Sequence, residues 1–175
     1  DLREMGLPVE QFIAANNSND VVFEYLKSGK YTPRPSVETI ANAMDVGAPS
    51  NFARILDLYD YSHSTISEII KGYRYSDEEI KSAVREVYEK TGYLCDPHGA
   101  CGYRALCEFL TENQVGVFLE TAHPAKFKET AEDIIGAGKV EIPAKLLEFT
   151  KGEKKSVPLG KDFPGFKQFL LSHIY

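Results

Sequence analysis

The feature that most constrains the fold is an apolar run that is followed by a hydroxyl and then by His-Pro. Residues 115–119 read Val-Gly-Val-Phe-Leu, and residues 120–127 continue Glu-Thr-Ala-His-Pro-Ala-Lys-Phe. A short β-branched and aromatic run before an amphipathic stretch predicts a strand, a tight turn and a helix. Pro124 suits the first helical position, where its missing N–H costs nothing. Because ligands of α/β folds bind at such strand-to-helix turns, this turn is the first candidate site.

The remaining pattern predicts mostly helices. We expect a second strand over 9–15, and helices over 20–27, 50–59, 76–90, 98–110, 123–135 and 163–174. The sequence Ser-Asp-Glu-Glu at residues 76–79 is a capping box, and residues 1–5 are typical of a helix end that Gly6 and Pro8 stop. Two strands do not make a complete sheet. The sequence therefore predicts an α/β chain with few strands and predominantly helical content.

Composition and charge limit the classes of partner. The chain has 175 residues, 43% of them hydrophobic, and a formal net charge of −6. This suffices for a hydrophobic core, while the scattered Lys and Arg argue against nucleic acid as a partner. No apolar stretch is long enough to span a membrane, and the start is not typical of a signal peptide. Cys95, Cys101 and Cys107 lack a Cys-x-x-Cys pair, so we expect buried side chains in a reducing, cytoplasmic compartment and no metal site.

Thr-Ala-His-Pro-Ala-Lys-Phe closely resembles the C-terminal signature of threonine synthases, which are pyridoxal-phosphate-dependent enzymes of fold type II. Further blocks resemble that family in the same order: Gly6–Ala15, Asn17–Asp20, Asn42–Val46, Pro49–Phe52 and Asp96–Ala100. The resemblance implies that the Schiff-base lysine and the loop that binds the cofactor phosphate lie upstream of Gly6. We therefore expect the C-terminal portion of a longer enzyme, with no catalytic residue of its own and no activity alone.

The resemblance also implies a domain organisation and partners. Residues 1–31 are the remainder of the cofactor-domain sheet, residues 32–90 a helical insert, and residues 91–175 a return to the cofactor domain. The expected partners are O-phosphohomoserine and the missing N-terminal half of the enzyme. Because an orphaned half-sheet leaves apolar area uncovered, we also expect the isolated chain to self-associate.

Thr121 is the strongest candidate for cofactor binding. By the resemblance, its hydroxyl contacts the ring nitrogen of pyridoxal phosphate and so tunes the ring as an electron sink. The residues alone allow a second interpretation, in which Thr121 caps the following helix. His123 either caps that helix or makes a functional contact beside the turn. Lys126 is not expected to form the Schiff base, because a lysine in the first turns of a helix is commonly solvated; it has a structural role or contacts the substrate phosphate.

Other candidates lie at the ends of predicted elements. Asp96 is expected to cap a helix that Pro97 opens, and the resemblance places Asp96 and His98 beside the cofactor. Asn17 and Asn19 follow the first strand, where their amides could bind the cofactor ring oxygen or the substrate carboxylate. The same residues also suit turns and helix caps, so both interpretations stand.

A helix start at residues 50–54 is a candidate for the substrate phosphate. Ser50, Asn51 and Arg54 lie there, and free N–H groups at a helix start bind anions; the alternative is that Ser50 is an ordinary N-cap. The resemblance implies conversion of O-phospho-L-homoserine and water to L-threonine and phosphate by γ-elimination and β-hydration. The alternative function is a non-catalytic relative that binds a phosphorylated small molecule.

Overall fold

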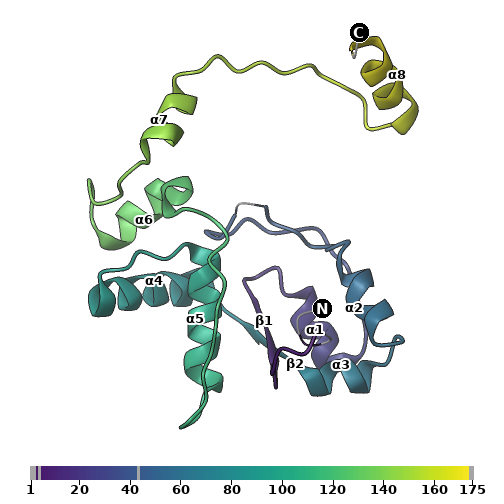
Figure 1. Ribbon diagram of the computed structural model, residues 1–175, viewed down its shortest axis with the longest axis vertical. Helices are drawn as coiled ribbons and strands as arrows, with labels where there is room; N and C mark the ends of the chain where they lie inside the picture. The colour runs from purple at the N-terminus through teal and green to yellow at the C-terminus, as the bar shows by residue number, and fades with distance from the viewer. Residues whose placement is uncertain (1–2, 4, 43, 174–175) are drawn as a thin grey trace. The chain divides into compact units, whose positions relative to one another are not determined.

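The computed structural model describes residue 3, residues 5–42 and residues 44–173 (Figure 1). The chain divides into two compact units, Asp1–Glu141 and Ile142–Tyr175. The elements of the first unit are β1 (Phe12–Asn16), α1 (Val21–Ser28), α2 (Phe52–Leu58), α3 (His63–Ile69), β2 (Ile70–Arg74), α4 (Asp77–Thr91), α5 (Pro97–Phe109), the 3-10 helix η1 (Pro124–Phe127) and α6 (Lys128–Ile135). The second unit contains α7 (Ala144–Thr150) and α8 (Phe163–His173).

Strands β1 and β2 form a parallel pair, in which Phe12 lies opposite Ile70 and Asn16 lies opposite Arg74. Parallel strands need a long crossover connection, and α1, α2 and α3 supply it. A Cβ on Gly72 of β2 would lie 3.0 Å from Leu26 and 3.2 Å from Phe23, so the missing side chain lets α1 pack closely on the pair.

Helices cover both faces of the strand pair. Ile13, Ala15 and Tyr73 pack against a core formed mainly by α4, α5 and α6, whereas Ile70 packs against a smaller core under α1, α2 and α3. In the smaller core the Phe52 ring stacks on Tyr31 at a centroid distance of 4.5 Å. Because successive strand residues point to opposite faces, β2 contributes Tyr73 to the larger core and Ile70 to the smaller one. The fold class predicted from the sequence is confirmed.

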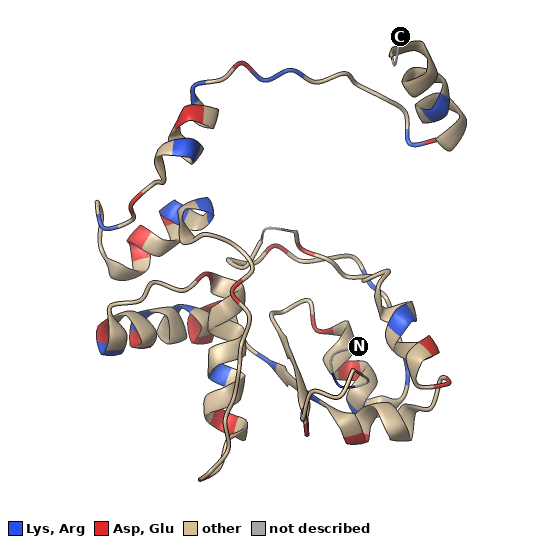
Figure 2. Cartoon of the chain, in the orientation of Figure 1, with Lys and Arg blue, Asp and Glu red and all other residues tan. Residues whose placement is uncertain are grey.

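Several predicted elements form where local signals placed them. Ser76 accepts a hydrogen bond from Glu79 N at 3.4 Å, and Glu79 accepts one from Ser76 N at 2.8 Å, which completes the capping box of α4. Helix α1 ends at Gly29, which has a φ of 72°. Acidic and basic residues are interspersed along α4 (Figure 2), where Lys90 lies 2.7 Å from Glu86. Among the described residues, no helix has the length and apolar character needed to cross a membrane.

The predicted strand over residues 115–119 is wrong. The segment is extended along α5 but is not part of the sheet. Gly116 packs on Leu106 and Leu110, and Phe118 packs on Gly102. The side chains that alternate with these two point away from α5: Val115, Val117 and Leu119 are 92%, 81% and 75% exposed. The composition suits a strand, but no described segment pairs with its backbone.

Other predictions need correction. Strand β2 lies within residues 32–90, which were expected to be helical, because its pairing with β1 is non-local. Helix α2 begins at Phe52, and its N-cap is Asn51. Cys95 and Cys101 are buried as expected, but the expected burial of Cys107 is wrong, since it is exposed near the C-terminal end of α5. Of the predicted helix end at residues 1–5, residues 1, 2 and 4 lie outside the described part of the chain, as does residue 174 of the last predicted helix.

Candidate functional site

A partly polar cavity of about 180 Å³ lies beyond the C-terminal end of β1. Its walls come from the end of β1, the loop that follows α1 and the first turns of α5. The residues that line it are Ala15, Asn17, Asn19, Ala41, Met44, Val46, His98 and Cys101. Ligands of α/β folds bind at this end of a parallel sheet. The structure thus brings together three candidates from separate parts of the sequence: Asn17, Asn19 and His98.

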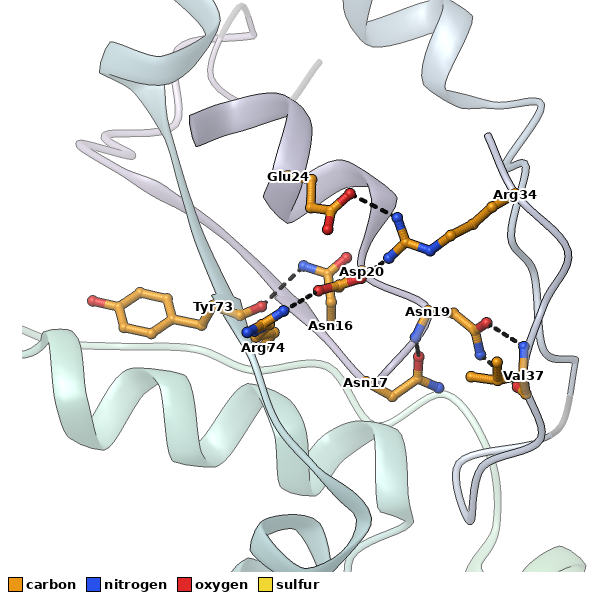
Figure 3. Close-up of polar contacts among 9 residues, drawn as sticks. All are labelled: Asn16, Asn17, Asn19, Asp20, Glu24, Arg34, Val37, Tyr73 and Arg74. Carbon is orange, nitrogen blue, oxygen red and sulfur yellow. Dashed lines mark hydrogen bonds and ion pairs between the residues drawn. The ribbon is translucent and has the colours of Figure 1, made fainter. Parts of the chain in front are cut away.

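Asn17 and Asn19 line the cavity, and their side-chain amides make hydrogen bonds that connect the end of β1 to the loop after α1. Figure 3 shows the contacts of Asn19 with Asn17 and Val37. Asn17 Nδ2 donates to Thr39 Oγ1 at 3.0 Å, and Asn17 Oδ1 accepts from Asn19 N at 2.9 Å. Asn19 Nδ2 donates to Val37 O at 2.9 Å and to Asp45 Oδ1 at 3.0 Å, and its oxygen accepts from Val37 N. Neither side chain caps α1. Their observed contacts are those of the turn interpretation, because they fasten the 37–46 loop over the strand end.

A buried carboxylate beside these amides was not singled out by the sequence analysis. Asp20 is 3% exposed and pairs with the guanidinium of Arg34, while Arg74 Nη1 lies 2.9 Å from its other oxygen (Figure 3). Arg34 also lies 2.6 Å from Glu24. The cluster joins α1, the loop after it and the end of β2. No sequence spacing signals these pairs, because the arginines follow Asp20 by 14 and 54 residues.

Asp96 is the most fully engaged side chain at the site. It is completely buried, and it caps α5 by accepting from His98 N at 2.7 Å and Gly99 N at 3.3 Å. It also accepts from Thr121 N and Ala122 N, each at 3.3 Å, and lies 3.0 Å from His98 Nδ1. Burial opposes its ionisation, but the bonds from His98 and the N–H groups hold the pKa of Asp96 well below its usual range.

The partner of Asp96 is the His98 imidazole, which lines the cavity. The hydrogen bond to Asp96 raises the pKa of His98, against the opposing effect of burial. The Phe127 ring of η1 lies against the imidazole at a centroid distance of 5.6 Å. The predicted N-cap role of Asp96 is confirmed, and the same carboxylate orients the His98 imidazole beside the cavity.

The turn over residues 120–122 is held against the start of α5. Besides the bonds of Thr121 N and Ala122 N to Asp96, the side chain of Glu120 accepts from Asp96 N at 3.0 Å. Partial burial and the neighbouring Asp96 carboxylate raise the pKa of Glu120 to about 7. The sequence analysis missed Glu120, since a glutamate before a turn has no distinguishing pattern.

Thr121 is presented by this turn and is exposed. His123, not Thr121, caps the following helix, because His123 Nδ1 accepts from Ala125 N at 3.1 Å. The interpretation of Thr121 as a helix cap is therefore wrong, and the capping interpretation of His123 is confirmed. Within the described part of the chain, the Thr121 hydroxyl makes no hydrogen bond. Lys126 is exposed on η1.

The structure does not bring the residue 50–54 candidates to the cavity. Ser50, Asn51 and Arg54 are exposed, and none of them lines it. The expected N-cap role of Ser50 is wrong, since α2 begins two residues later and its N-cap side chain makes no capping bond. A phosphate contact of these residues stays a prediction.

Comparison with known proteins agrees with this arrangement. The sequence model of a family described as pyridoxal-phosphate dependent enzyme matches residues 2–120. The chain belongs to this family. A second model, for the C-terminal part of threonine synthase, matches residues 99–170, so the predicted resemblance to threonine synthases is confirmed. The two matches overlap over α5 and the segment that reaches Glu120.

Individual members of the pyridoxal-phosphate-dependent family show how much of an enzyme the chain represents. It is 38% identical to threonine synthase from Haemophilus influenzae and 37% identical to that from Escherichia coli, covering 97% and 98% of this chain but 39% of each relative. The crystal structure of the Escherichia coli enzyme superimposes with a TM-score of 0.83 at 36% identity, over 98% of this chain and 39% of that one. A structure of PLP-bound threonine synthase from Brucella melitensis gives 0.79 at 26% identity, over 98% and 42%.

Proposed function

We propose that this chain contributes the C-terminal portion of a threonine synthase that converts O-phospho-L-homoserine and water to L-threonine and phosphate. The family matches support this assignment, and so does the coverage of about two fifths of the relatives. The structural observation that carries it is the 120–122 turn, which is fastened to α5 and leaves the Thr121 hydroxyl without a partner among the described residues.

The residues present fit the ring of pyridoxal phosphate. A ring nitrogen needs one partner, and the turn offers a free hydroxyl. The nearby carboxylate of Asp96 is already engaged by four backbone N–H groups and the His98 imidazole. A hydroxyl partner leaves the ring nitrogen largely neutral, whereas a carboxylate would hold it protonated. The donor set therefore favours Thr121 as the residue that holds the ring nitrogen.

Each of the other residues has a distinct role in this proposal. When bound, pyridoxal phosphate supplies an electron sink for the carbanions formed at the substrate Cα and Cβ. Asp96 fixes the turn so that the Thr121 hydroxyl needs no reorganisation during the reaction. His98 presents an imidazole that is oriented by Asp96 at the cavity wall, where it can donate a hydrogen bond to a ligand. Asn17 and Asn19 keep the 37–46 loop in place and so define the opposite wall.

The experiment uses the full-length protein that contains this chain. We expect a visible absorption band from the bound cofactor, and equal amounts of threonine and phosphate from O-phosphohomoserine. Tight binding of the phosphorylated substrate without phosphate release would overturn the enzymatic proposal and favour the non-catalytic alternative. The isolated chain should release no phosphate, because the resemblance assigns the cofactor-bonding lysine to another part of the enzyme.

A further inference from the structure

Glu120 and Asp96 bind each other's segments reciprocally. Asp96 N donates to Glu120 Oε2 at 3.0 Å, while the two residues after Glu120 donate their N–H groups to Asp96 Oδ2 at 3.3 Å each. Three hydrogen bonds thus close a ring between the start of α5 and the turn.

Gly99 makes room for this arrangement. A Cβ on Gly99 would coincide with a carboxyl oxygen of Glu120, and the nearest other Glu120 atom would lie 2.5 Å from it. Gly99 is buried in the first turn of α5, and its N–H donates to Asp96. The absent side chain therefore lets the Glu120 carboxyl lie directly on the helix start.

We propose that Glu120 is a positioning residue, which holds the 120–122 turn on α5 and thereby aims the Thr121 hydroxyl. The inference rests on the proposed function, in which Thr121 contacts the cofactor ring. The groups that face the Glu120 carboxyl are Asp96 and His98 at the start of α5, and Tyr93 and Cys95 in the segment before it. Below neutral pH Glu120 is uncharged beside the ionised Asp96. Ionisation of Glu120 places two like charges side by side, so the turn loosens as the pH rises towards the raised pKa of Glu120.

Amide hydrogen exchange of the full-length protein that contains this chain, prepared without cofactor, tests this inference. At pH 6, Glu120→Ala should accelerate exchange of the Asp96, Thr121 and Ala122 amides by about five- to tenfold, as expected for the loss of one hydrogen bond. Glu120→Gln keeps an acceptor and should restore protection. Gly99→Ala should mimic Glu120→Ala, because its Cβ displaces the carboxyl. Glu112→Ala, at an exposed turn residue, is the control.

The pH dependence separates Glu120 from His98. After correction for intrinsic exchange, the wild-type protein should lose protection at these amides as the pH rises from the ordinary glutamate value of about 4.3 to about 7. Glu120→Gln should lose less over this range because it cannot ionise, whereas His98 is present in both proteins. Unchanged exchange in both Glu120→Ala and Gly99→Ala would overturn the inference, as would Glu120→Gln behaving like Glu120→Ala. The amides of Ala83 and Val84 in the α4 core report whether each variant stays folded.

A kinetic arm in the full-length enzyme tests whether Glu120 acts through Thr121. Glu120→Ala should lower kcat about tenfold with little change in KM, and should have no further effect when Thr121→Ala is already present. Additive losses would overturn the positioning role. Full activity of Thr121→Ala would instead refute the proposed function. The exchange experiment would still decide, independently of that outcome, whether Glu120 holds the 120–122 turn on α5.

Discussion

Asp96→Asn tests the account of the site with almost no change of shape. The substitution replaces one carboxylate oxygen by an NH2 group and removes the charge that His98 faces. An asparagine is also a good N-cap, so its oxygen can keep the bonds from His98 N and Gly99 N. Its NH2 group then faces the N–H groups of Thr121 and Ala122, which are donors too.

The size of the effect follows from these contacts. Two backbone donors lose their acceptor, at about 1–3 kcal/mol for each that stays buried. Breaking a buried charge pair costs about 3–5 kcal/mol, and the two contributions overlap because they share one carboxylate. We expect the free energy of unfolding to fall by about 3–5 kcal/mol. With a urea dependence of about 2 kcal/mol per molar, the midpoint should fall by roughly 2 M.

The assay is urea unfolding of the chain followed by far-ultraviolet circular dichroism, with Asp133→Asn, at an exposed position of α6, as the control. The lowered pKa of Asp96 stabilises the fold above the ordinary value of about 3.9, and this is lost as the pH falls through the folded value. The raised pKa of His98 stabilises the fold below about 6.5, and this is lost as the pH rises through the folded value.

The difference between wild type and Asp96→Asn should therefore be largest between about pH 4 and pH 6.5. A variant that unfolds at the wild-type urea concentration throughout this range would refute the argument. So would a difference that grows as the pH rises above 7.

Three further substitutions test other parts of the structure. Asp20→Asn removes the buried charge that Arg34 and Arg74 neutralise, and should lower the free energy of unfolding by about 3 kcal/mol in urea titrations; a loss below about 1 kcal/mol would mean that the cluster contributes little. Ser76→Ala removes the capping box of α4 and should cost about 1 kcal/mol, measured by thermal unfolding, whereas an unchanged melting temperature would contradict this. Val117 is 81% exposed, and Val117→Lys should reduce self-association of the isolated chain in sedimentation velocity without lowering its stability. Equal association would show that the exposed side chains of Val115, Val117 and Leu119 do not form the contact between copies.

Local signals were sufficient to predict much of the fold. The capping box at Ser76, the helix end at Gly29 and the Asp96-Pro97 helix start depend on contacts within a few residues, so the sequence contains all of their determinants. Strand β2 depends on pairing with β1, which is 58 residues away at Phe12 and Ile70. Such pairing leaves no local pattern. The converse error occurred at residues 115–119, where the composition suits a strand but the described chain offers no partner.

At the candidate site, too, local patterns identified the segments, whereas contacts between distant residues determine what the side chains do. The segments of Asn17, His98 and Thr121 were found from strand ends, a helix start and the family signature. What each side chain does there depended on distant partners: Asn17 on Thr39, and Thr121 on the buried Asp96. Glu120 was missed because its role depends on Gly99, a residue of α5 that leaves space for the Glu120 carboxyl.

The most direct test of the central claim is the rate of threonine formation by the full-length enzyme with Thr121→Ala. Loss of one hydrogen bond to the ring nitrogen is worth about 1–3 kcal/mol, so we expect kcat to fall roughly ten- to a hundredfold. The visible band of the bound cofactor should persist in Thr121→Ala and in the control Lys126→Ala. Wild-type turnover in Thr121→Ala, or loss of the visible band in Lys126→Ala, would contradict the assignment of this turn.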